Sequence, residues 1–453
     1  MAQITLAQAA LWCGGTIDPK YSDVVFLGAN NDSRNIEPGQ LFVALQGARD
    51  GHDFIPMALQ KGAAAVLCTH CEGDYPAIVV EDTRIALGQI ARGERIRIGM
   101  KVVGVTGSVG KSTTKEMIAS VLETTYRVAK TPANHNNDIG MPMAILSVPE
   151  DTEVAVLEMG MNHFREIAYL SNIAQPDVAV IINIGTMHIE HLGSKEGIRQ
   201  AKLEILEGLR PGGIILLNGD DEMLWPVREG LNVPSIYFGA ENTACNIRAT
   251  NVRSDEAGLS FKVQTGKEAF SVSLVLEGRH YVPDALAAVC AGIQLGVNSE
   301  RIQHALGTFR NMAGRQEIFQ AGDYTIIKDC YNAGPESMAA ALSVLGKKTG
   351  RRIAVLGDML ELGERAPEEH YKVGCMVAKQ ADMLFAYGPN SKRMVSGAIA
   401  EGMNSAQAQA FEDRETLASA LKASVMAGDV LLFKGSHGMH MERILELFLD
   451  REV

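Results

Sequence analysis

The sequence predicts an α/β protein of three domains. Its 453 residues correspond to about three domains at roughly 150 residues each. Short, continuous apolar runs alternate with helix-length segments through the second and third parts of the chain. Such alternation is typical of parallel strands that helices cover on both faces, and changes in the pattern place the boundaries near residues 99 and 314.

Residues 1–99 are expected to form a mixed α/β domain. The opening MAQITLAQAALWCGG predicts a strand followed by a short helix. No basic residue precedes its apolar stretch, so we do not expect a signal peptide. Short apolar runs predict the other elements, which are strands at Val24–Leu27, Leu41–Ala44, Ala63–Cys68 and Ala77–Val80 and a helix at Phe54–Lys61.

Residues 100–314 are expected to form a central domain around a parallel sheet. The β-branched run Val102–Val105 predicts a strand that leads through a glycine-rich turn into a helix. The apolar residues of that helix recur at helical spacing, and they are Met117, Ile118, Val121 and Leu122. Further buried strands are predicted at Val154–Leu157, Val178–Ile182 and Ile214–Leu217. Residues 247–276 alternate polar and apolar side chains like an antiparallel appendage, and helices are predicted at Asp284–Leu295 and Ser299–Phe309.

Residues 315–453 are expected to form a Rossmann-like C-terminal domain. Strands are predicted at Tyr324–Lys328, Arg352–Leu356, Met383–Tyr387 and Val430–Phe433, with helical stretches between them. This βα alternation again indicates a parallel sheet with helices on its faces.

Charge and composition exclude several classes of function. The chain has 42 Lys and Arg against 54 Asp and Glu, a net charge of −12, so long-range repulsion opposes general binding to nucleic acid or to an anionic membrane. No apolar run approaches the roughly 18 residues that a membrane-spanning helix needs. We therefore expect a cytoplasmic protein without a membrane span and without a nucleic-acid partner.

The seven cysteines do not form the pattern of a disulfide framework, and we expect reduced thiols. Cys68-Thr69-His70-Cys71 has the spacing of a metal or redox pair. Because no second Cys-x-x-Cys completes a zinc site, we interpret these residues as thiols that close a strand.

The strongest signal in the sequence is a glycine-rich loop between a strand and a helix. It comprises Thr106, Gly107, Ser108, Val109, Gly110, Lys111, Ser112 and Thr113. Its glycines let backbone amides converge on an anion, while the positive end of the helix points to the same place. Lys111 would neutralise the β- and γ-phosphates and the Ser112 hydroxyl would bind Mg²⁺. The strict phosphate-loop pattern is not met, because Val105 stands at its first glycine and Gly107 takes that part. ATP or GTP binding is predicted; a glycine-rich turn with a chance Lys-Ser is the alternative.

Three residues beyond this loop are candidates for chemistry, each with a plainer alternative. Glu158 closes a strand of the central sheet, where a carboxylate can hold Mg²⁺ beside a triphosphate, or it is a solvated strand end. His188 follows the next strand, and a lone histidine there is more often a hydrogen-bonded loop residue. Lys202 lies in a predicted helix, and the pattern alone favours a surface lysine paired with nearby glutamates.

The glycine-shifted loop resembles that of the Mur ligases, the ATP-dependent amide-forming enzymes of peptidoglycan synthesis. Matching strings follow in order over nearly the whole chain. They are Asn31–Arg34, Pro38-Gly39, Leu41–Leu45, Gly47 and Asp50–Asp53 in the first domain; Thr131–Pro142, Glu158–Gly160, Asn183–Gly185 with His188, and Ala201-Lys202 in the second; and Gly314-Arg315, Asp329, Tyr331–Ala333 and Lys434–Ser436 in the third.

The resemblance implies a role for each group of matched residues. Ser33, Arg34, Gly47, Asp50 and His52 would bind the uridine-nucleotide substrate. ATP would be bound by the phosphate loop and by Asn134, Asn137, His280, Arg315, Asp329 and Asn332. Of these, Arg315 would contact a phosphate and Asp329 the ribose hydroxyls. Asp358, Lys434 and Ser436 would face the incoming amino substrate. Lys111, Glu158, His188 and Lys202 would be catalytic, and the metal ligands would be Ser112, Glu158, His188 and a carbamate that CO₂ forms on Lys202. Such a carbamate needs a neutral amine.

Within the family, Gly357-Asp358-Met359 with Glu361-Leu362-Gly363 resembles the member that adds D-alanyl-D-alanine to UDP-MurNAc-tripeptide. The member that adds the third residue usually carries an Asp-Asn-Pro-Arg motif, and this sequence has none. The resemblance therefore implies an ATP- and Mg²⁺-dependent ligase that forms UDP-MurNAc-pentapeptide through an acyl phosphate. We expect a monomer.

Other readings stay open at this point. Within the family they are the third-residue ligase and a folate polyglutamate synthase, although the long first domain argues against the latter. Outside it they are a kinase and a nucleotide-regulated binding protein without ligase activity. Tyr281 and Asp284 keep the binding protein open, because the family's His-Asn-x-x-Asn reads His280-Tyr281-Val282-Pro283-Asp284 in this sequence. A second departure is that the family's Tyr-Asn-Ala-Asn reads Tyr331-Asn332-Ala333-Gly334. A third departure is the pair of histidines, His437 and His440, in the loop after the last strand.

Overall fold

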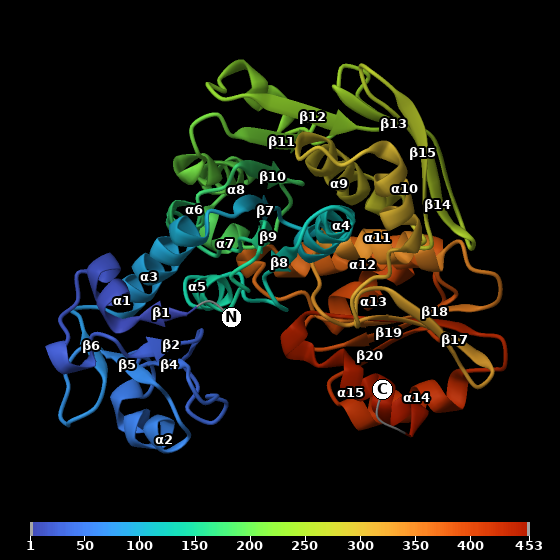
Figure 1. The fold of residues 1–453 in the computed structure, drawn as a ribbon. Helices are drawn as coiled ribbons and strands as arrows, with labels where there is room; N and C mark the ends of the chain where they lie inside the picture. The colour runs from blue at the N-terminus through green and yellow to red at the C-terminus, as the bar shows by residue number, and fades with distance from the viewer. Residues whose placement is uncertain (1–2, 451–453) are drawn as a thin grey trace.

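The computed structural model describes residues 3–450 and contains one two-stranded and three larger sheets. Figure 1 shows the N-terminal unit (blue) and the C-terminal unit (orange to red) on either side of a central unit that both adjoin. In this described part of the chain, no helix has the length and apolar character needed to cross a bilayer.

The N-terminal unit has a small antiparallel pair and a four-stranded parallel sheet in the order β3-β4-β5-β6. Its elements are β1 (Ile4–Thr5), α1 (Leu6–Cys13), β2 (Val25–Phe26), β3 (Ala29–Asn30), β4 (Leu41–Val43), α2 (Ile55–Gln60), β5 (Ala65–Cys68), β6 (Ala77–Val79) and α3 (Thr83–Ile98). The predicted opening strand and helix, and the predicted helix near residue 55, are confirmed. The Cys68 thiol is buried at the end of β5 and donates to the carbonyl of Ile78, so it closes the strand as expected.

The central unit is built on a nine-stranded sheet in the order β15-β14-β13-β12-β11-β10-β7-β9-β8. Its strands are β7 (Lys101–Thr106), β8 (Val128–Lys130), β9 (Val154–Glu158), β10 (Val178–Ile181), β11 (Ile214–Asn218), β12 (Ser235–Gly239), β13 (Ile247–Asp255), β14 (Gly258–Gln264) and β15 (Ala269–Leu274). Its helices are α4 (Lys111–Glu123), α5 (Gly140–Leu146), α6 (Glu166–Ala174), α7 (Ile189–Leu192), α8 (Lys195–Leu203), α9 (Val282–Gln294) and α10 (Ser299–Thr308).

The parallel core of this sheet is confirmed, and the predicted antiparallel segment turns out to extend it. β13, β14 and β15 pair antiparallel as expected, but β13 also pairs parallel with β12. The junction consists of two residue pairs, Phe238 with Ile247 and Gly239 with Arg248. The segment is therefore the edge of the central sheet rather than a separate appendage.

Alternate residues of the central strands enter two different hydrophobic cores. Val102 packs on one face with residues of α3, α5, α6 and α8, whereas Val103 packs on the other face with α4, α9 and α10. Helix α3 belongs to the N-terminal unit, so the core of that unit is continuous with one face of the central sheet. Both faces are covered, which explains why these strands read as continuous apolar runs.

The C-terminal unit has a six-stranded sheet in the order β16-β17-β21-β18-β19-β20, parallel except for the edge strand β16. Its strands are β16 (Glu317–Ala321), β17 (Tyr324–Asp329), β18 (Arg352–Gly357), β19 (Met383–Tyr387), β20 (Ala408–Phe411) and β21 (Val430–Lys434). Helices α11 (Pro335–Leu345), α12 (Ala366–Gln380) and α13 (Ser391–Ala400) cover one face, and α14 (Arg414–Ser424) and α15 (Met441–Leu449) cover the other. The predicted Rossmann-like arrangement is confirmed, with two edge strands, β16 and β20, that were not predicted.

A buried arginine joins the N-terminal unit to the central unit. Arg95 of α3 donates from Nε to the carbonyl of Ala174 at 2.8 Å and from Nη2 to that of Gln175 at 2.8 Å. The same Nη2 lies 3.3 Å from Asp177 Oδ2. These carbonyls lie at the C-terminal end of helix α6, so the guanidinium pairs groups that would otherwise be buried without a partner.

Replacing this arginine should destabilise the protein through the groups it leaves unpaired. We expect Arg95→Met to lower the apparent free energy of unfolding by about 2–4 kcal/mol, measured by urea denaturation. Arg92→Met on the same helix is the control, because Arg92 is exposed and should cost less than about 0.5 kcal/mol. Equal midpoints for the two variants would contradict this role of Arg95.

Candidate active site

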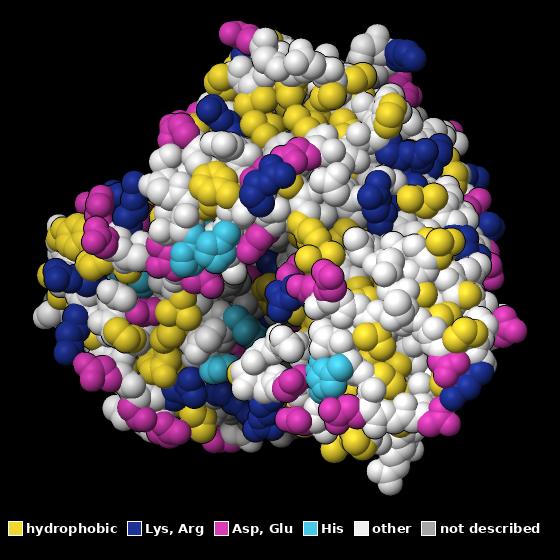
Figure 2. All heavy atoms as spheres, turned by 90° about the vertical axis from the view of Figure 1, so that its left-hand side faces the viewer, with side chains coloured by type: hydrophobic (Ala, Val, Ile, Leu, Met, Phe, Trp, Pro, Cys, Tyr) yellow, Lys and Arg dark blue, Asp and Glu magenta, His cyan; other side chains and the backbone are white. Residues whose placement is uncertain are grey.

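A cavity of about 500 Å³ lies where the carboxyl edge of the central sheet meets the C-terminal unit. The central unit lines it with the glycine-rich loop, Glu158, Asn183, His188 and the start of α9. The C-terminal unit contributes Arg315, Asp329, Asn332, Glu336 and Lys434. Figure 2 shows a deep hollow on this side of the molecule, with histidine and basic side chains at its walls. Residues far apart in the sequence are thus brought to one site.

The glycine-rich loop has the conformation that the sequence predicts. Gly110 caps helix α4 with φ 86°, in the left-handed region. A Cβ there would lie 2.6 Å from Asp284 Oδ1, so no other residue fits without a shift. Lys111 Nζ donates to the carbonyls of Gly107 at 3.0 Å and Ser108 at 3.3 Å, which folds the lysine back over the loop.

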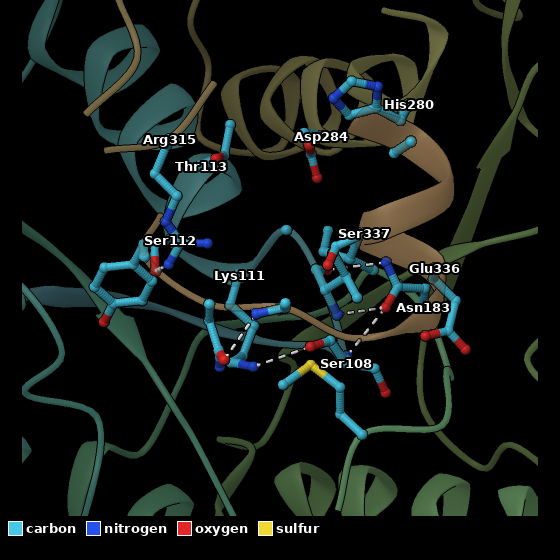
Figure 3. A pocket seen from close by; sticks show the side chains of 18 of the residues that line it. Ser108, Lys111, Ser112, Thr113, Asn183, His280, Asp284, Arg315, Glu336 and Ser337 are labelled. Atoms are coloured by element: carbon cyan, nitrogen blue, oxygen red, sulfur yellow. Dashed lines mark hydrogen bonds between the residues drawn. The ribbon is translucent and has the colours of Figure 1, made fainter. Parts of the chain in front are cut away.

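Asn183 holds this loop in place, as the dashed lines in Figure 3 show. Its Oδ1 accepts from the amides of Ser108 at 3.0 Å and Val109 at 2.9 Å, and its Nδ2 donates to the Val109 carbonyl at 2.9 Å. Asn183 comes just after β10, the strand next to β7. Asn183 is among the residues matched to the family, but no contact with the glycine-rich loop was predicted for it. That contact arises because β10 lies next to β7 in the sheet, and the order of the strands was not predicted from the sequence.

Two lysines in the site have lowered pKa values, and of these Lys202 is buried and Lys111 half-buried. Burial lowers the pKa of Lys111, and nearby Glu158 only partly offsets this. Burial, with repulsion from Lys111, brings the pKa of Lys202 well below its ordinary value. Within residues 3–450 the Lys202 ammonium has no hydrogen-bond or ion-pair partner, although the side chain is only 2% exposed. The alternative of a surface lysine paired with glutamates is therefore wrong, and burial favours the neutral amine that a carbamate needs.

Glu158 is a buried carboxylate with one oxygen free. Asn136 Nδ2 donates to its Oε1 at 2.8 Å, whereas its Oε2 is buried without a hydrogen-bond partner. The nearest cation is Lys115, whose Nζ lies 3.9 Å from Oε2. The alternative of a solvated strand end is wrong, because an unpartnered buried carboxylate oxygen is costly unless a cation binds it. Asn136 is a site residue to which the sequence assigned no role.

These residues fit a divalent cation, though not as a complete protein cage. Across residues 3–450, no three His, Cys, Asp or Glu side chains are grouped to hold a metal ion. Glu158 Oε2 and the Ser112 hydroxyl are oxygen ligands of the kind that Mg²⁺ prefers, and phosphate oxygens would complete its shell. His188 lines the same cavity, and its Nδ1 lies 2.8 Å from Oε2 of Glu361 in the C-terminal unit.

Arg315 reaches from the start of the C-terminal unit to the phosphate-loop helix. Its Nη2 donates to Ser112 Oγ at 3.1 Å, and its guanidinium lies 3.9 Å from the ring centre of Tyr331. Figure 3 shows Arg315 and Ser112 on one side of the loop, with Asn183 and Glu336 on the other. The predicted approach of Arg315 to the phosphate site is thus present in the fold.

The other predicted residues of the C-terminal unit divide into two groups. Lys434, expected to face the amino substrate, lies in the cavity and donates to Asp329 Oδ2 at 2.6 Å and to the carbonyl of Asn332 at 3.0 Å. Asp358 and Ser436 do not line the cavity. Asp358 Oδ2 accepts from Asn390 Nδ2 at 2.8 Å, and Ser436 Oγ accepts from the amide of Leu360 at 2.9 Å. Both therefore order loops behind the cavity.

His280, which was predicted to contact ATP, lies with the two departures Tyr281 and Asp284 at the start of α9. Burial lowers the pKa of His280 to about 4, and its ring centre lies 4.1 Å from that of Tyr281. Tyr281 Oη accepts from Asn311 Nδ2 at 2.9 Å. Burial raises the pKa of Asp284 to about 7, although Thr114 donates to its Oδ1 at 2.7 Å. The departures at Tyr281 and Asp284 are thus packed against the phosphate-loop helix.

Of the predicted residues in the loop before α5, Asn134 lines the cavity and Asn137 does not. Asn137 Oδ1 instead accepts from the amide of Gly140 at 2.8 Å, so it orders the start of α5.

The residues expected to bind the uridine nucleotide lie in the N-terminal unit, outside this cavity. Arg34 is exposed and pairs with Asp32, while Ser33 is buried against Met57. The other three lie in and beside the loop after β4. His52 Nδ1 lies 2.6 Å from Asp50 Oδ1, its Nε2 accepts from the amide of Thr69 at 3.0 Å, and Gly47 turns back onto the carbonyl of Arg49.

A second cavity of about 290 Å³ lies beside this group, within the N-terminal unit. It is lined by Leu45, Gln46, Thr69, Glu81, Asp82, Thr83 and Arg84. None of the five residues predicted to bind the uridine nucleotide lines it, but Thr69, which contacts His52, does.

Comparison with known proteins identifies the family. Three family models match in order: "Mur ligase family, catalytic domain" over residues 26–95, "Mur ligase middle domain" over 105–292 and "Mur ligase, glutamate ligase domain" over 314–437. The chain is 37% identical to the UDP-N-acetylmuramoyl-tripeptide--D-alanyl-D-alanine ligase of Bacillus subtilis strain 168, over 99% of each chain.

Two solved structures agree with the sequence matches. A crystal structure of MurF from Acinetobacter baumannii superposes with a TM-score of 0.93 at 31% identity and covers 100% of both chains. The MurF ligase of Thermotoga maritima, solved in complex with ADP, gives a TM-score of 0.82 at 30% identity and covers 93% of this chain and 97% of its own. The expected three-domain α/β fold is confirmed. The sequence matches and the fold lead to one conclusion: the chain belongs to the Mur ligase family.

Proposed function

We propose that this protein is an ATP-dependent amide ligase that joins D-alanyl-D-alanine to UDP-MurNAc-tripeptide in peptidoglycan precursor synthesis. The products would be UDP-MurNAc-pentapeptide, ADP and phosphate. The observation that carries the proposal is the cavity in which the phosphate loop faces Arg315, Asp329 and Lys434 of another domain. The names and near-complete coverage of the relatives support this choice of substrates over those of the third-residue ligase.

The reaction must activate a carboxylate, because an oxide ion is a very poor leaving group. An oxygen of the tripeptide carboxylate attacks the γ-phosphorus of ATP, ADP leaves, and an acyl phosphate forms. The amine of D-alanyl-D-alanine then attacks the acyl carbon, loses a proton, and expels phosphate. Both steps gather anions, so the site must supply cations and fixed donors.

The residues of the cavity are suited to this task. Lys111 and Arg315 would face the phosphates, with the amides of residues 106–113, while Asn134, His280, Asp329 and Asn332 would contact the rest of ATP. Mg²⁺, held by Glu158 and Ser112 and by His188 and carbamylated Lys202, would neutralise phosphate charge. The closed cavity would keep water from the acyl phosphate. Asn137 would act only indirectly, through the loop that it orders.

The remaining assignments follow from the same proposal. The N-terminal domain, residues 1–99, would hold the uridine diphosphate through Ser33, Arg34, Gly47, Asp50 and His52. Residues 315–453 would present the dipeptide, with Lys434 in the cavity and with Asp358 and Ser436 shaping the loops behind it. Residues 100–314 would bind ATP. We further propose a monomer that acts in the cytoplasm.

Phosphate release from Mg²⁺-ATP tests the function directly. We expect release only when the nucleotide tripeptide and D-alanyl-D-alanine are both present, with a matching pentapeptide mass. Lys111→Met should lower kcat at least about 100-fold, because it removes a donor aimed at the transferring phosphate. Lys101→Met, an exposed residue of β7, is the control. Release with a diamino acid and nucleotide dipeptide would support the sister ligase, and ATP binding without any release would support a binding protein.

The carbamate can be detected on the protein itself. In ¹³C-bicarbonate, the protein should show a carbamate ¹³C resonance that Lys202→Met abolishes, since only a neutral, buried amine captures CO₂. Lys195→Met is the control, because Lys195 is partly exposed and paired with Glu222. A spectrum of Lys202→Met identical to that of the parent protein would remove the carbamate from the proposal.

Asp284 should make stability depend on pH. Its pKa is raised to about 7 in the folded protein, so the folded state keeps a proton that the unfolded state loses near pH 4. The contribution of Asp284 to stability should therefore be fully present below about pH 4 and be lost as the pH rises to about 7. Asp284→Asn should match the parent protein at low pH and be more stable by roughly 2–4 kcal/mol at pH 8.

Urea denaturation between pH 4 and 8 measures the effect. Glu256→Gln, in an exposed turn of the same unit, is the control for loss of a carboxylate. Parallel stability profiles for Asp284→Asn and the parent protein would show that Asp284 is ionised throughout.

A further inference from the structure

Two carboxylates of the C-terminal unit hold the loop that follows β10. We propose that Glu336, assisted by Glu361, is a positioning residue that fixes this loop, and through it the phosphate loop, when the C-terminal unit closes on the central unit. The inference rests on the proposed ligase function. It adds the contact through which the C-terminal unit orders the phosphate loop of the central unit.

The loop after β10 is bonded to the phosphate loop on one side. Asn183 binds the amides of Ser108 and Val109, as described above. The amide of Gly185 donates to Ser108 Oγ at 2.8 Å, and that of Ile184 donates to Asp221 Oδ2 at 2.8 Å. A shift of residues 183–185 would therefore move the phosphate loop.

On its other side the same loop is bonded to Glu336, in the first turn of α11. Glu336 Oε1 accepts from the amide of Thr186 at 2.9 Å and from its hydroxyl at 3.1 Å. A Cβ at Gly185 would lie 2.9 Å from Glu336 Cδ, so the carboxylate comes this close only because that residue is glycine. Figure 3 shows Glu336 beside Asn183 at one end of the cavity.

A second contact fixes the far end of the loop. Oε2 of Glu361 lies 2.8 Å from Nδ1 of His188. Both residues have left-handed backbones, with φ 62° for Glu361 and 63° for His188. Side-chain-bearing residues keep this conformation only where their surroundings hold it, so the contact helps to set the position of His188 in the cavity.

The arrangement makes the order of the site depend on domain placement. The donors belong to the central unit and the acceptors to the C-terminal unit, so the bonds form only when the two are close. Glu336 accepts from the amide and the hydroxyl of Thr186 and acts on the phosphate loop only through this loop, which makes it a positioning residue. Its loss should lower kcat rather than weaken ATP binding, because Lys111 and the loop amides remain.

Substitution at Glu336 separates this role from a general loss of structure. Glu336→Ala should lower kcat about tenfold, with less than about a twofold change in KM for ATP. Glu336→Gln keeps a side-chain oxygen that can accept from the Thr186 amide, so it should lose less than about threefold. Glu364→Ala is the control, since Glu364 is an exposed acid on the same unit. Equal thermal midpoints would exclude unfolding as the cause.

Small-angle X-ray scattering gives a readout independent of turnover. With ADP and Mg²⁺ present, Glu336→Ala should have a larger radius of gyration than the parent protein, and Glu336→Gln should resemble the parent. Parental kcat and scattering for Glu336→Ala would overturn the inference, as would a loss in Glu336→Gln as large as in Glu336→Ala. Failure of the parent protein to release phosphate with both substrates would instead overturn the proposed function, and the scattering comparison would still test the contact.

Discussion

The site depends on one geometric constraint, which is that parallel strands end at the same edge of their sheet. The order β10-β7-β9 places Asn183, the phosphate loop and Glu158 side by side, although they are far apart in the chain. Asn183 then pairs loop amides that would otherwise be buried without partners. The loop is thus held by the sheet that carries it, and the other residues of the site are arranged around it.

The parts of the site that could be predicted from the sequence are those whose residues lie within one continuous segment of the chain. Gly110 and Lys111 belong to one motif, and Glu158 ends an apolar run, so their surroundings follow from the neighbouring residues. Asn136 and Glu336 could not be found in this way. Each reaches its partner from a loop or helix of another segment, and only the packing of that segment decides whether they meet.

The fold shows the same division between local pattern and packing. Both large parallel sheets follow from the alternation of apolar runs and helices. The attachment of β13 does not, because it rests on two residue pairs beside β12 that leave no signal in composition or period. Lys202 is a related case, since charged neighbours on its helix favour exposure whereas the helix turns that residue into the core. The pattern of apolar residues predicts the helices and strands, whereas contacts between elements that are distant in sequence decide which side chains are buried.

The contacts between the central and C-terminal units are buried at one end of the interface and exposed at the other. This difference indicates how the two units move relative to each other. Near their junction, Lys348 and Glu277 form an ion pair at 2.6 Å that is largely buried, which is costly to separate. At the mouth of the cavity, Glu336 and Glu361 are exposed, and exposed contacts contribute little each and exchange readily with water. Opening should therefore begin at the mouth while the junction stays closed. Substrates could then enter and products leave through the mouth of the cavity while the Lys348–Glu277 ion pair at the junction stays intact.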